Sequence, residues 1–158
     1  MNVSARADIE IRRAADDVFD LAASCEGFPR FIHRLGPIPG VTHAELVDAA
    51  VPKSGVRRRI STTDGNVIEE ELLAFERPSR HRYRWRNRPP LPFRLLVSGA
   101  EGDWSFAPIA GGTRIVWDYR FELTSPFVYP LAAVGMALFR RWMQRALARL
   151  SSLLTEAA

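Results

Sequence analysis

The chain has 158 residues, of which 47% are hydrophobic and 25% are charged, the composition of one ordinary globular domain over residues 1–158. These values exclude a disordered chain, a collagen-like repeat and a protein that crosses a membrane several times. The single cysteine, Cys25, excludes a framework of disulfides within the chain and a zinc site built from several cysteines. The N-terminal residues lack the pattern of a secretory signal, so we expect a cytoplasmic protein.

The first half of the chain predicts a strand, two short helices and a second strand. Residues 3–12 alternate apolar and polar side chains, which is typical of a half-buried strand. A short helix is expected over residues 16–24, and a second one carries Phe28 and Phe31. Proline and glycine turn residues then lead into a strand over residues 41–47.

The second half predicts five more strands and a long helix. The dipeptide Asp64-Gly65, between strands at residues 55–63 and 66–76, is a strong signal for a two-residue hairpin turn. The remaining elements are three strands and a C-terminal helix, at residues 80–88, 95–108, 113–123 and 127–154.

The order of these elements and three short motifs resemble the START-like (SRPBCC) superfamily, which includes polyketide cyclases and lipid-transfer proteins. The motifs are IRRAADDVF at residues 11–19, GDWSF at 102–106, and GGTR at 111–114 before Trp117. The resemblance implies an α+β helix-grip fold, in which a curved antiparallel sheet of about seven strands surrounds a long C-terminal helix, with two short helices after the first strand. Members bind hydrophobic ligands in a cavity between sheet and helix. Some members are cyclases or aromatases and many have no catalytic activity, so the fold alone does not determine the function.

The hairpin turn at Asp64-Gly65 decides which charged side chains face the helix. With a two-residue turn, Arg58 lies directly opposite Glu71, and Glu69 lies beside them. The strand face that carries these three residues is apolar at both ends, so we expect it to be the concave one. A slip of one residue in the pairing would reverse the two faces.

Residues 80–88 alternate arginines with aromatic or polar side chains. The arginines are expected on the outer face of the sheet, because five unpaired buried cations would cost far too much. The interleaved carboxylates of neighbouring strands argue against a nucleic-acid partner, despite a net charge of +4 and 21 arginines in the chain. The residues then expected inside, from this strand and the last hairpin, include His81, Tyr83, Trp85, Trp117 and Tyr119.

The sequence contains no motif for a serine nucleophile, a phosphate-binding loop or a metal-binding helix, and we expect neither metal nor cofactor. The polar candidates for catalysis are Arg58, Glu71 and His81. In an enzyme, Arg58 can hold a ligand carbonyl and Glu71 can act as the base for enolisation. The alternatives are contact with a ligand without catalysis and a purely structural ion pair.

Three functions remain open at this stage. The first is the binding or transport of a hydrophobic or aromatic small molecule or lipid. The second is a polyketide cyclase or aromatase-type enzyme, and the third is a quinone or membrane-lipid chaperone. The residues expected to contact the ligand are Phe28, Phe31, Arg58, Glu69, Glu71, Tyr83, Trp85, Trp117, Tyr119 and Met136.

The long C-terminal helix has two halves of different character. It is amphipathic from Phe139 onward, whereas residues 126–139 carry no charge and are apolar on all sides. Val134 and Ala137 are expected to point outward and to need a cover. We favour the apolar, proline-rich loop 88–93 as that cover, over a second copy of the protein and a membrane surface. The residues expected to point inward are Leu131, Ala132, Gly135, Met136 and Phe139.

Overall fold

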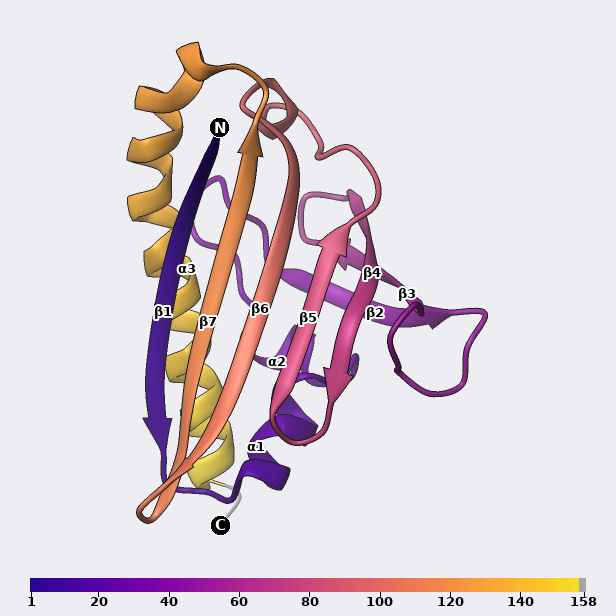
Figure 1. The fold of residues 1–158 in the computed structure, drawn as a ribbon, viewed down its shortest axis with the longest axis vertical. Coiled ribbons are helices and arrows are strands. Elements are labelled where there is room, and N and C mark those ends of the chain that lie inside the picture. The colour runs from indigo at the N-terminus through magenta and orange to yellow at the C-terminus, as the bar shows by residue number, and fades with distance from the viewer. Residues whose placement is uncertain (157–158) are drawn as a thin grey trace.

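The computed structural model describes residues 1–156, which form an antiparallel sheet curved around one long helix (Figure 1). The strands are β1 (Asn2–Ile11), β2 (Val41–Val47), β3 (Arg57–Thr62), β4 (Val67–Glu76), β5 (Arg80–Trp85), β6 (Val97–Ile109) and β7 (Gly112–Leu123). The helices are α1 (Ala15–Ala22), α2 (Phe28–Phe31) and α3 (Tyr129–Glu156), with 3-10 turns η1 (Phe93–Leu95) and η2 (Pro126–Val128).

The seven strands follow the order β1-β7-β6-β5-β4-β3-β2. Strands β2 to β7 therefore form a continuous meander, and β1 closes one edge by pairing with β7. The connection from β1 to the opposite edge carries α1 and α2, and α3 packs on the concave side against β1. The predicted α+β helix-grip fold is confirmed.

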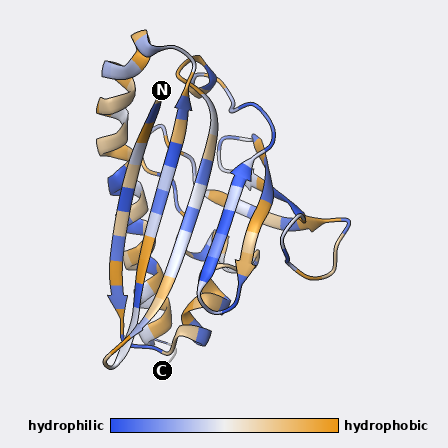
Figure 2. Cartoon of the chain, viewed as in Figure 1, coloured by the Kyte–Doolittle hydropathy of each residue, from blue (hydrophilic) through white to orange (hydrophobic). Residues whose placement is uncertain are grey.

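The core is formed by side chains that recur at every second residue in the strands and at every third or fourth residue in α3. Along β7 every second side chain is buried on the concave face, and the bands of alternating hydropathy along the strands are visible in Figure 2. Helix α3 contributes a stripe at three- and four-residue spacing, and burial of each large apolar side chain in it stabilises the fold by roughly 1.5–3 kcal/mol. The buried residues of α3 are Ala132, Trp142, Met143, Ala146, Leu147, Leu150 and Leu154.

The outer face of the sheet carries the arginines, and most of them are paired with carboxylates on neighbouring strands. The guanidinium groups of Arg84, Arg114 and Arg120 lie 2.7, 2.7 and 3.0 Å from the carboxylates of Glu71, Asp8 and Glu101. Such exposed pairs contribute about 0–1 kcal/mol each to stability. They neutralise the outer face more than they stabilise it.

The β3–β4 hairpin contradicts the predicted register by one residue. Thr62, not Thr63, pairs with Asn66, and Arg58 therefore lies opposite Glu70 rather than Glu71. The Asp64 carboxylate accepts a hydrogen bond from the Asn66 backbone N–H, and this contact favours a three-residue connection. The connection ends at Gly65, whose φ of 81° lies in the left-handed region that glycine adopts without strain.

A β-bulge at Leu73 shifts the pairing of β4 with β5 by one residue. Beyond the bulge, Phe75 lies opposite His81 on the inner face of the sheet. Before the bulge, Glu71 lies opposite Arg84 on the outer face. Because of the bulge, apolar side chains face inward at both ends of β4, although the pairing of β4 with β3 differs from the predicted register by one residue.

The proline-rich loop does not cover the outward face at the start of α3. Val134 and Ala137 are exposed, and so is Leu131, which was expected inside. The preference for loop 88–93 as the cover is therefore wrong, because its buried residue, Pro89, lines the interior instead. Gly135 is also exposed, although it borders the cavity, and the residues that pack inward are Ala132, Met136 and Phe139. No helix within residues 1–156 is long and apolar enough to cross a membrane.

Gly102 on β6 lies opposite Tyr83, and a Cβ at this position would overlap the tyrosine ring. We expect Gly102→Ala to lower the free energy of unfolding by about 1–3 kcal/mol, because the ring must move into the interior. Urea denaturation measures the change. Gly99→Ala on the same strand is the matched control, because its Cβ would meet only a Glu122 oxygen at 3.7 Å. Equal stability of the two variants would contradict the close packing of Tyr83 on Gly102.

Candidate functional site

A cavity of about 210 Å³ lies between the concave face of the sheet and α3. Its wall is almost entirely apolar, and aromatic side chains from β5, β6, β7 and α3 form most of it. An apolar cavity of roughly 150 Å³ is large enough to bind benzene, so this one has room for one or two fused rings. The aromatic wall residues are Phe28, Tyr83, Trp85, Phe93, Trp104, Trp117, Tyr119, Phe121, Phe139 and Trp142.

Contacts between the wall rings fix their positions and leave the cavity open. Trp104 stacks on Trp117 with ring centroids 4.2 Å apart, and Phe139 of α3 meets the Tyr119 ring edge to face at 5.0 Å. The Trp85 indole N–H donates a hydrogen bond to the Tyr119 hydroxyl over 3.2 Å. Edge-to-face and offset packing of this kind is favourable and directional, so the rings brace one another rather than collapse inward.

One buried polar cluster adjoins the cavity, formed by Arg58, Glu70 and His81. Arg58 donates from Nε and Nη2 to the same Glu70 oxygen, Oε1, over 2.9 and 2.6 Å. Its Nη1 lies 2.9 Å from His81 Nε2. Because a guanidinium only donates, Nε2 must accept, which assigns the proton of a neutral imidazole to Nδ1.

The cation of Arg58 is also covered by aromatic rings. Its central carbon lies 4.7 Å from the Phe28 ring centroid and 5.1 Å from that of Tyr83. Desolvated cation–π contacts contribute up to about 2 kcal/mol. The paired carboxylate and these two rings together compensate the cost of burying the charge.

Burial determines the protonation behaviour of this cluster. The pKa of His81 is lowered well below its usual 6.5, first by burial and then by the charge of Arg58. Burial raises the pKa of Glu70, with Arg58 opposing the shift, and it raises the pKa of Tyr83 to about 12. The short contacts from Arg58 are those of an ionised carboxylate, so the cluster holds one positive and one negative charge.

The structure brings most of the predicted ligand-contacting residues together around the cavity. The residues of that prediction that line it are Phe28, Arg58, Tyr83, Trp85, Trp117, Tyr119 and Met136. Phe31 is buried behind the wall, where it packs edge-on against Trp104. His81 is fully buried behind Arg58.

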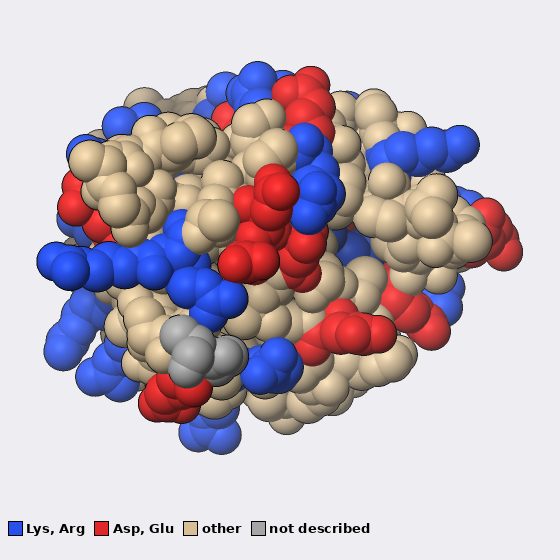
Figure 3. Space-filling model, turned by 90° about the horizontal axis from the view of Figure 1, so that it is seen from below, with Lys and Arg blue, Asp and Glu red and all other residues tan. Residues whose placement is uncertain are grey.

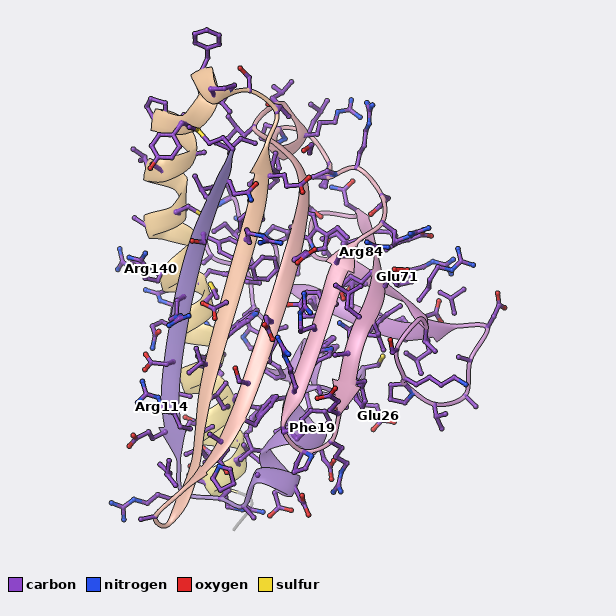
Figure 4. All side chains as sticks on the ribbon, in the orientation of Figure 1. Phe19, Glu26, Glu71, Arg84, Arg114 and Arg140 are labelled. Atoms are coloured by element: carbon purple, nitrogen blue, oxygen red, sulfur yellow. The ribbon has the colours of Figure 1, made fainter. Side chains whose placement is uncertain are left out.

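Glu69 and Glu71 do not point into the cavity, and this part of the prediction is wrong. Glu71 forms an ion pair with Arg84 on the outer face, and Figure 4 shows the two side chains next to each other. Glu69 lies 3.8 Å from Arg59 on the same face. The one-residue error in the register of β3–β4 explains both misplacements.

Glu70 is the polar residue that the sequence reasoning missed. Its strand offers two alternating faces, one with Glu69 and Glu71, the other with Glu70 between Ile68 and Leu72. Burying the second face places a single carboxylate inside, which one arginine can neutralise. The count of buried charges was therefore the signal that could have identified the correct register.

A second, more open cleft of about 600 Å³ lies beside α1 and is shared by Cys25 and Arg58. Burial raises the pKa of the Cys25 thiol, the opposite of what an activated nucleophile needs. Among residues 1–156 no group of three or more histidine, cysteine or acidic side chains could hold a metal ion. The Arg58–Glu70 pair is thus the ionic feature of the cavity wall. The buried indole N–H groups of Trp117 and Trp142, which have no hydrogen-bond partner among the described residues, are further polar groups in this wall.

The neutral, buried state of His81 predicts a pH dependence of stability. Below pH 6.5 the unfolded chain takes up a proton on this residue that the folded chain does not, so stability falls as the pH falls. Relative to His81→Gln, the wild type should lose up to about 1.4 kcal/mol per pH unit below pH 6.5. Urea denaturation at a series of pH values measures the slope.

Glu70 contributes with the opposite sign, because its raised pKa favours the folded state as the pH falls. Glu70 is present in both the wild type and His81→Gln, so the difference in slope between these two proteins reports the contribution of His81. His33→Gln, which removes an exposed imidazole in place of the buried one, is the control variant. Identical slopes for His81→Gln and the wild type would mean that the buried imidazole takes up its proton normally.

Comparison with known proteins agrees with this architecture. No curated protein matches the sequence. Protein TTHA0849 from Thermus thermophilus superposes with a TM-score of 0.71 at 24% identity, and Ara h 8.0201 with 0.67 at 11%; each match covers 99% of both chains. The di-domain ARO/CYC BexL from the BE-7585A biosynthetic pathway superposes with 0.62 at 20% identity, over 98% of this chain and 49% of that one. At these identities the likeness shows the fold alone.

The sequence itself carries the family relationship. The family described as polyketide cyclase/dehydrase and lipid transport matches residues 2–155, nearly the whole chain. The resemblance to the START-like superfamily is thereby confirmed. The chain belongs to the polyketide cyclase/dehydrase and lipid-transport family.

Proposed function

We propose that the protein binds a neutral, hydrophobic ring compound in the cavity between the sheet and α3, as a carrier or sensor. The observation that supports this most directly is the open space of about 210 Å³ inside a wall of braced aromatic rings. The ligand pockets of proteins are concave and mostly apolar, with a few polar groups that orient the ligand. Cytoplasmic location remains a prediction.

The size of the cavity favours a compact ligand. A lipid with two acyl chains is several times larger than a one- or two-ring compound and would need the wall to open. The same holds for the long tail of a membrane quinone, although a quinone head group is of suitable size. A small ring compound is therefore the best match among the ligand classes that the family suggests.

The buried ion pair favours a neutral ligand. Arg58 directs Nε and Nη2 to Glu70 and Nη1 to His81, so no cation of the cavity wall is without a partner in the described structure. A ligand carboxylate would have to displace Glu70 from Arg58. That would leave a buried carboxylate unpaired, which costs about 3–5 kcal/mol.

Glu70 also has a free acceptor for a ligand hydroxyl. Both hydrogen bonds from Arg58 end on Oε1, and no donor within residues 1–156 contacts Oε2. A phenol or enol that donates to Oε2 would gain a charge-assisted hydrogen bond. We therefore expect a hydroxyl group on the preferred ligand.

The proposal can be tested with three probes that share one ring system: naphthalene, 2-naphthol and 2-naphthoate. Quenching of tryptophan fluorescence reports occupancy, because Trp85, Trp104 and Trp117 line the cavity. We expect 2-naphthol to bind best and 2-naphthoate to bind weakest. Absence of binding by all three, or preference for the anion, would contradict the proposal.

Glu70→Gln should weaken binding of 2-naphthol by about tenfold or more, the value of a hydrogen bond to a charged group, and leave naphthalene unchanged. Glu71→Gln on the outer face is the matched control and should bind both probes normally. Because Glu70→Gln leaves Arg58 unpaired, the double variant Arg58→Met/Glu70→Gln is measured beside it. Equal affinities for 2-naphthol in wild type and both variants would remove Glu70 from the site.

An acid–base enzyme of the polyketide cyclase type is the second candidate, favoured by the raised pKa of Glu70 at the cavity. Among the described residues Glu70, not Glu71, is the carboxylate that lines the cavity, so the role of enolising base predicted for Glu71 passes to Glu70. Hydrogen–deuterium exchange next to the carbonyl of 1-tetralone, a neutral bicyclic ketone, separates the two candidates. Acceleration by wild type that is lost in Glu70→Gln favours the enzyme, and unaccelerated exchange favours the carrier.

A further inference from the structure

At one end of the molecule, five large apolar side chains are exposed to solvent, and we name them the apolar tip. Their exposed fractions are 94% for Phe127, 72% for Val134, 64% for Leu95, 62% for Leu131 and 55% for Leu91. They come from the loop after β5, from η2 and from the start of α3, which lie together at the top of Figure 1. An exposed apolar cluster of this kind marks an interaction surface.

The two segments of the apolar tip are joined to each other and to the cavity. Thr124 donates hydrogen bonds from its hydroxyl to the Leu95 carbonyl over 2.8 Å and from its N–H to the Leu96 carbonyl over 2.9 Å. On their inner sides the same segments line the cavity, through Pro89, Pro90, Phe93, Gly135 and Met136. Whatever contacts the apolar tip therefore lies against the wall of the ligand cavity.

The segments that form the apolar tip carry charge of one sign only. The segments 77–100 and 124–155 contain no aspartate or glutamate. Four exposed arginines follow or flank the tip, and within the part of the chain that the structure describes none of them forms a salt bridge: Arg88, Arg94, Arg140 and Arg141. The opposite end of the molecule differs, because acidic and basic side chains are mixed there (Figure 3).

The geometry of α3 places its arginines beyond the apolar residues. Arg140 and Arg141 follow Val134 by six and seven residues, or roughly 10 Å along the helix axis. Arg140 projects away from the sheet (Figure 4). Apolar side chains of an interfacial helix enter a bilayer by roughly 5–10 Å, so inserted tip residues would leave these arginines at the level of the lipid head groups.

We propose that the apolar tip docks on the surface of a membrane that contains anionic lipids, with its apolar side chains in the interface and the four arginines on the lipid phosphates. This goes beyond ligand binding and does not depend on which compound occupies the cavity. Docking would bring the loop and helix segment that line the cavity against the bilayer, where a hydrophobic ligand is concentrated.

A second copy of the chain and an acidic protein would fit this surface less well than a membrane. Contact between two copies of the tip would bring two sets of unpaired arginines together, and like charges at an interface are repulsive. An acidic protein would need a pocket for Phe127, whose side chain stands almost free of its own chain. A lipid interface needs no preformed pocket because it deforms around the inserted ring.

The test is flotation of the purified chain with vesicles of phosphatidylcholine containing phosphatidylglycerol, beside vesicles of phosphatidylcholine alone. We expect the wild type to float with the anionic vesicles and to be released by high salt, because the head-group attraction is screened. Failure to float, or equal flotation with both kinds of vesicle, would overturn the proposal. Ligand binding in solution is measured separately, so failure of one proposal does not imply failure of the other.

Two pairs of variants locate the contact. Phe127→Ser/Leu131→Ser should lower the partition coefficient by at least about tenfold, since each ring or chain loses its apolar burial. The control, Val51→Ser/Val67→Ser, removes exposed apolar side chains outside the tip and should float as the wild type does. All four positions are exposed, so the fold should persist, and circular dichroism checks it.

In the second pair of variants, Arg94→Gln/Arg140→Gln removes two arginines of the tip and should lower partitioning into anionic vesicles by about fivefold for each arginine. Arg12→Gln/Arg57→Gln, at exposed positions away from the tip, is its control. Wild-type flotation of both tip variants would overturn the proposal. Light scattering identifies the alternative of a second copy: a dimer that becomes a monomer in Phe127→Ser/Leu131→Ser, without flotation of the wild type, would assign the tip to self-association.

Discussion

The buried ion pair of Arg58 and Glu70 is the contact on which the chemistry of the interior depends. It joins β3 to β4 on the concave face, makes the cation–π contacts with Phe28 and Tyr83, and hydrogen-bonds the buried His81 behind it. One cation and one anion cancel, so the remaining wall can be apolar without leaving a charge uncompensated. A shift of the β3–β4 pairing by one residue would bury two carboxylates against one arginine, which the interior could not neutralise.

The cavity exists because rigid rings meet before they fill the space between sheet and helix. Stacked, tilted and edge-to-face contacts among Trp104, Trp117, Tyr119 and Phe139 support each ring from its neighbours. The same rings give the wall its apolar character, and the buried ionic cluster makes one side of the cavity polar. The same few contacts thus determine the size of the cavity, the neutrality of its wall and the one carboxylate oxygen that is free to accept a hydrogen bond.

The surface divides into two regions with different charge arrangements. On the outer face of the sheet, arginines and carboxylates alternate across neighbouring strands and largely cancel. At the apolar tip there are no carboxylates in the contributing segments, and the arginines are unpaired among the described residues. Paired charges suit a face toward water, whereas unpaired cations beside exposed apolar side chains suit a face toward an anionic, apolar partner.

Alternation and helical spacing are local properties of the chain, and they were enough to predict the strands, the helices and the sidedness of β5, β6 and β7. Two features needed the tertiary structure. The register of β3 against β4 depended on a hydrogen bond from Asn66 to Asp64 within the turn, which turned Glu70 inward and Glu71 outward. The exposure of Leu131 depended on how α3 packs on the sheet, since a helix segment that is apolar on all sides carries no pattern that selects its buried face.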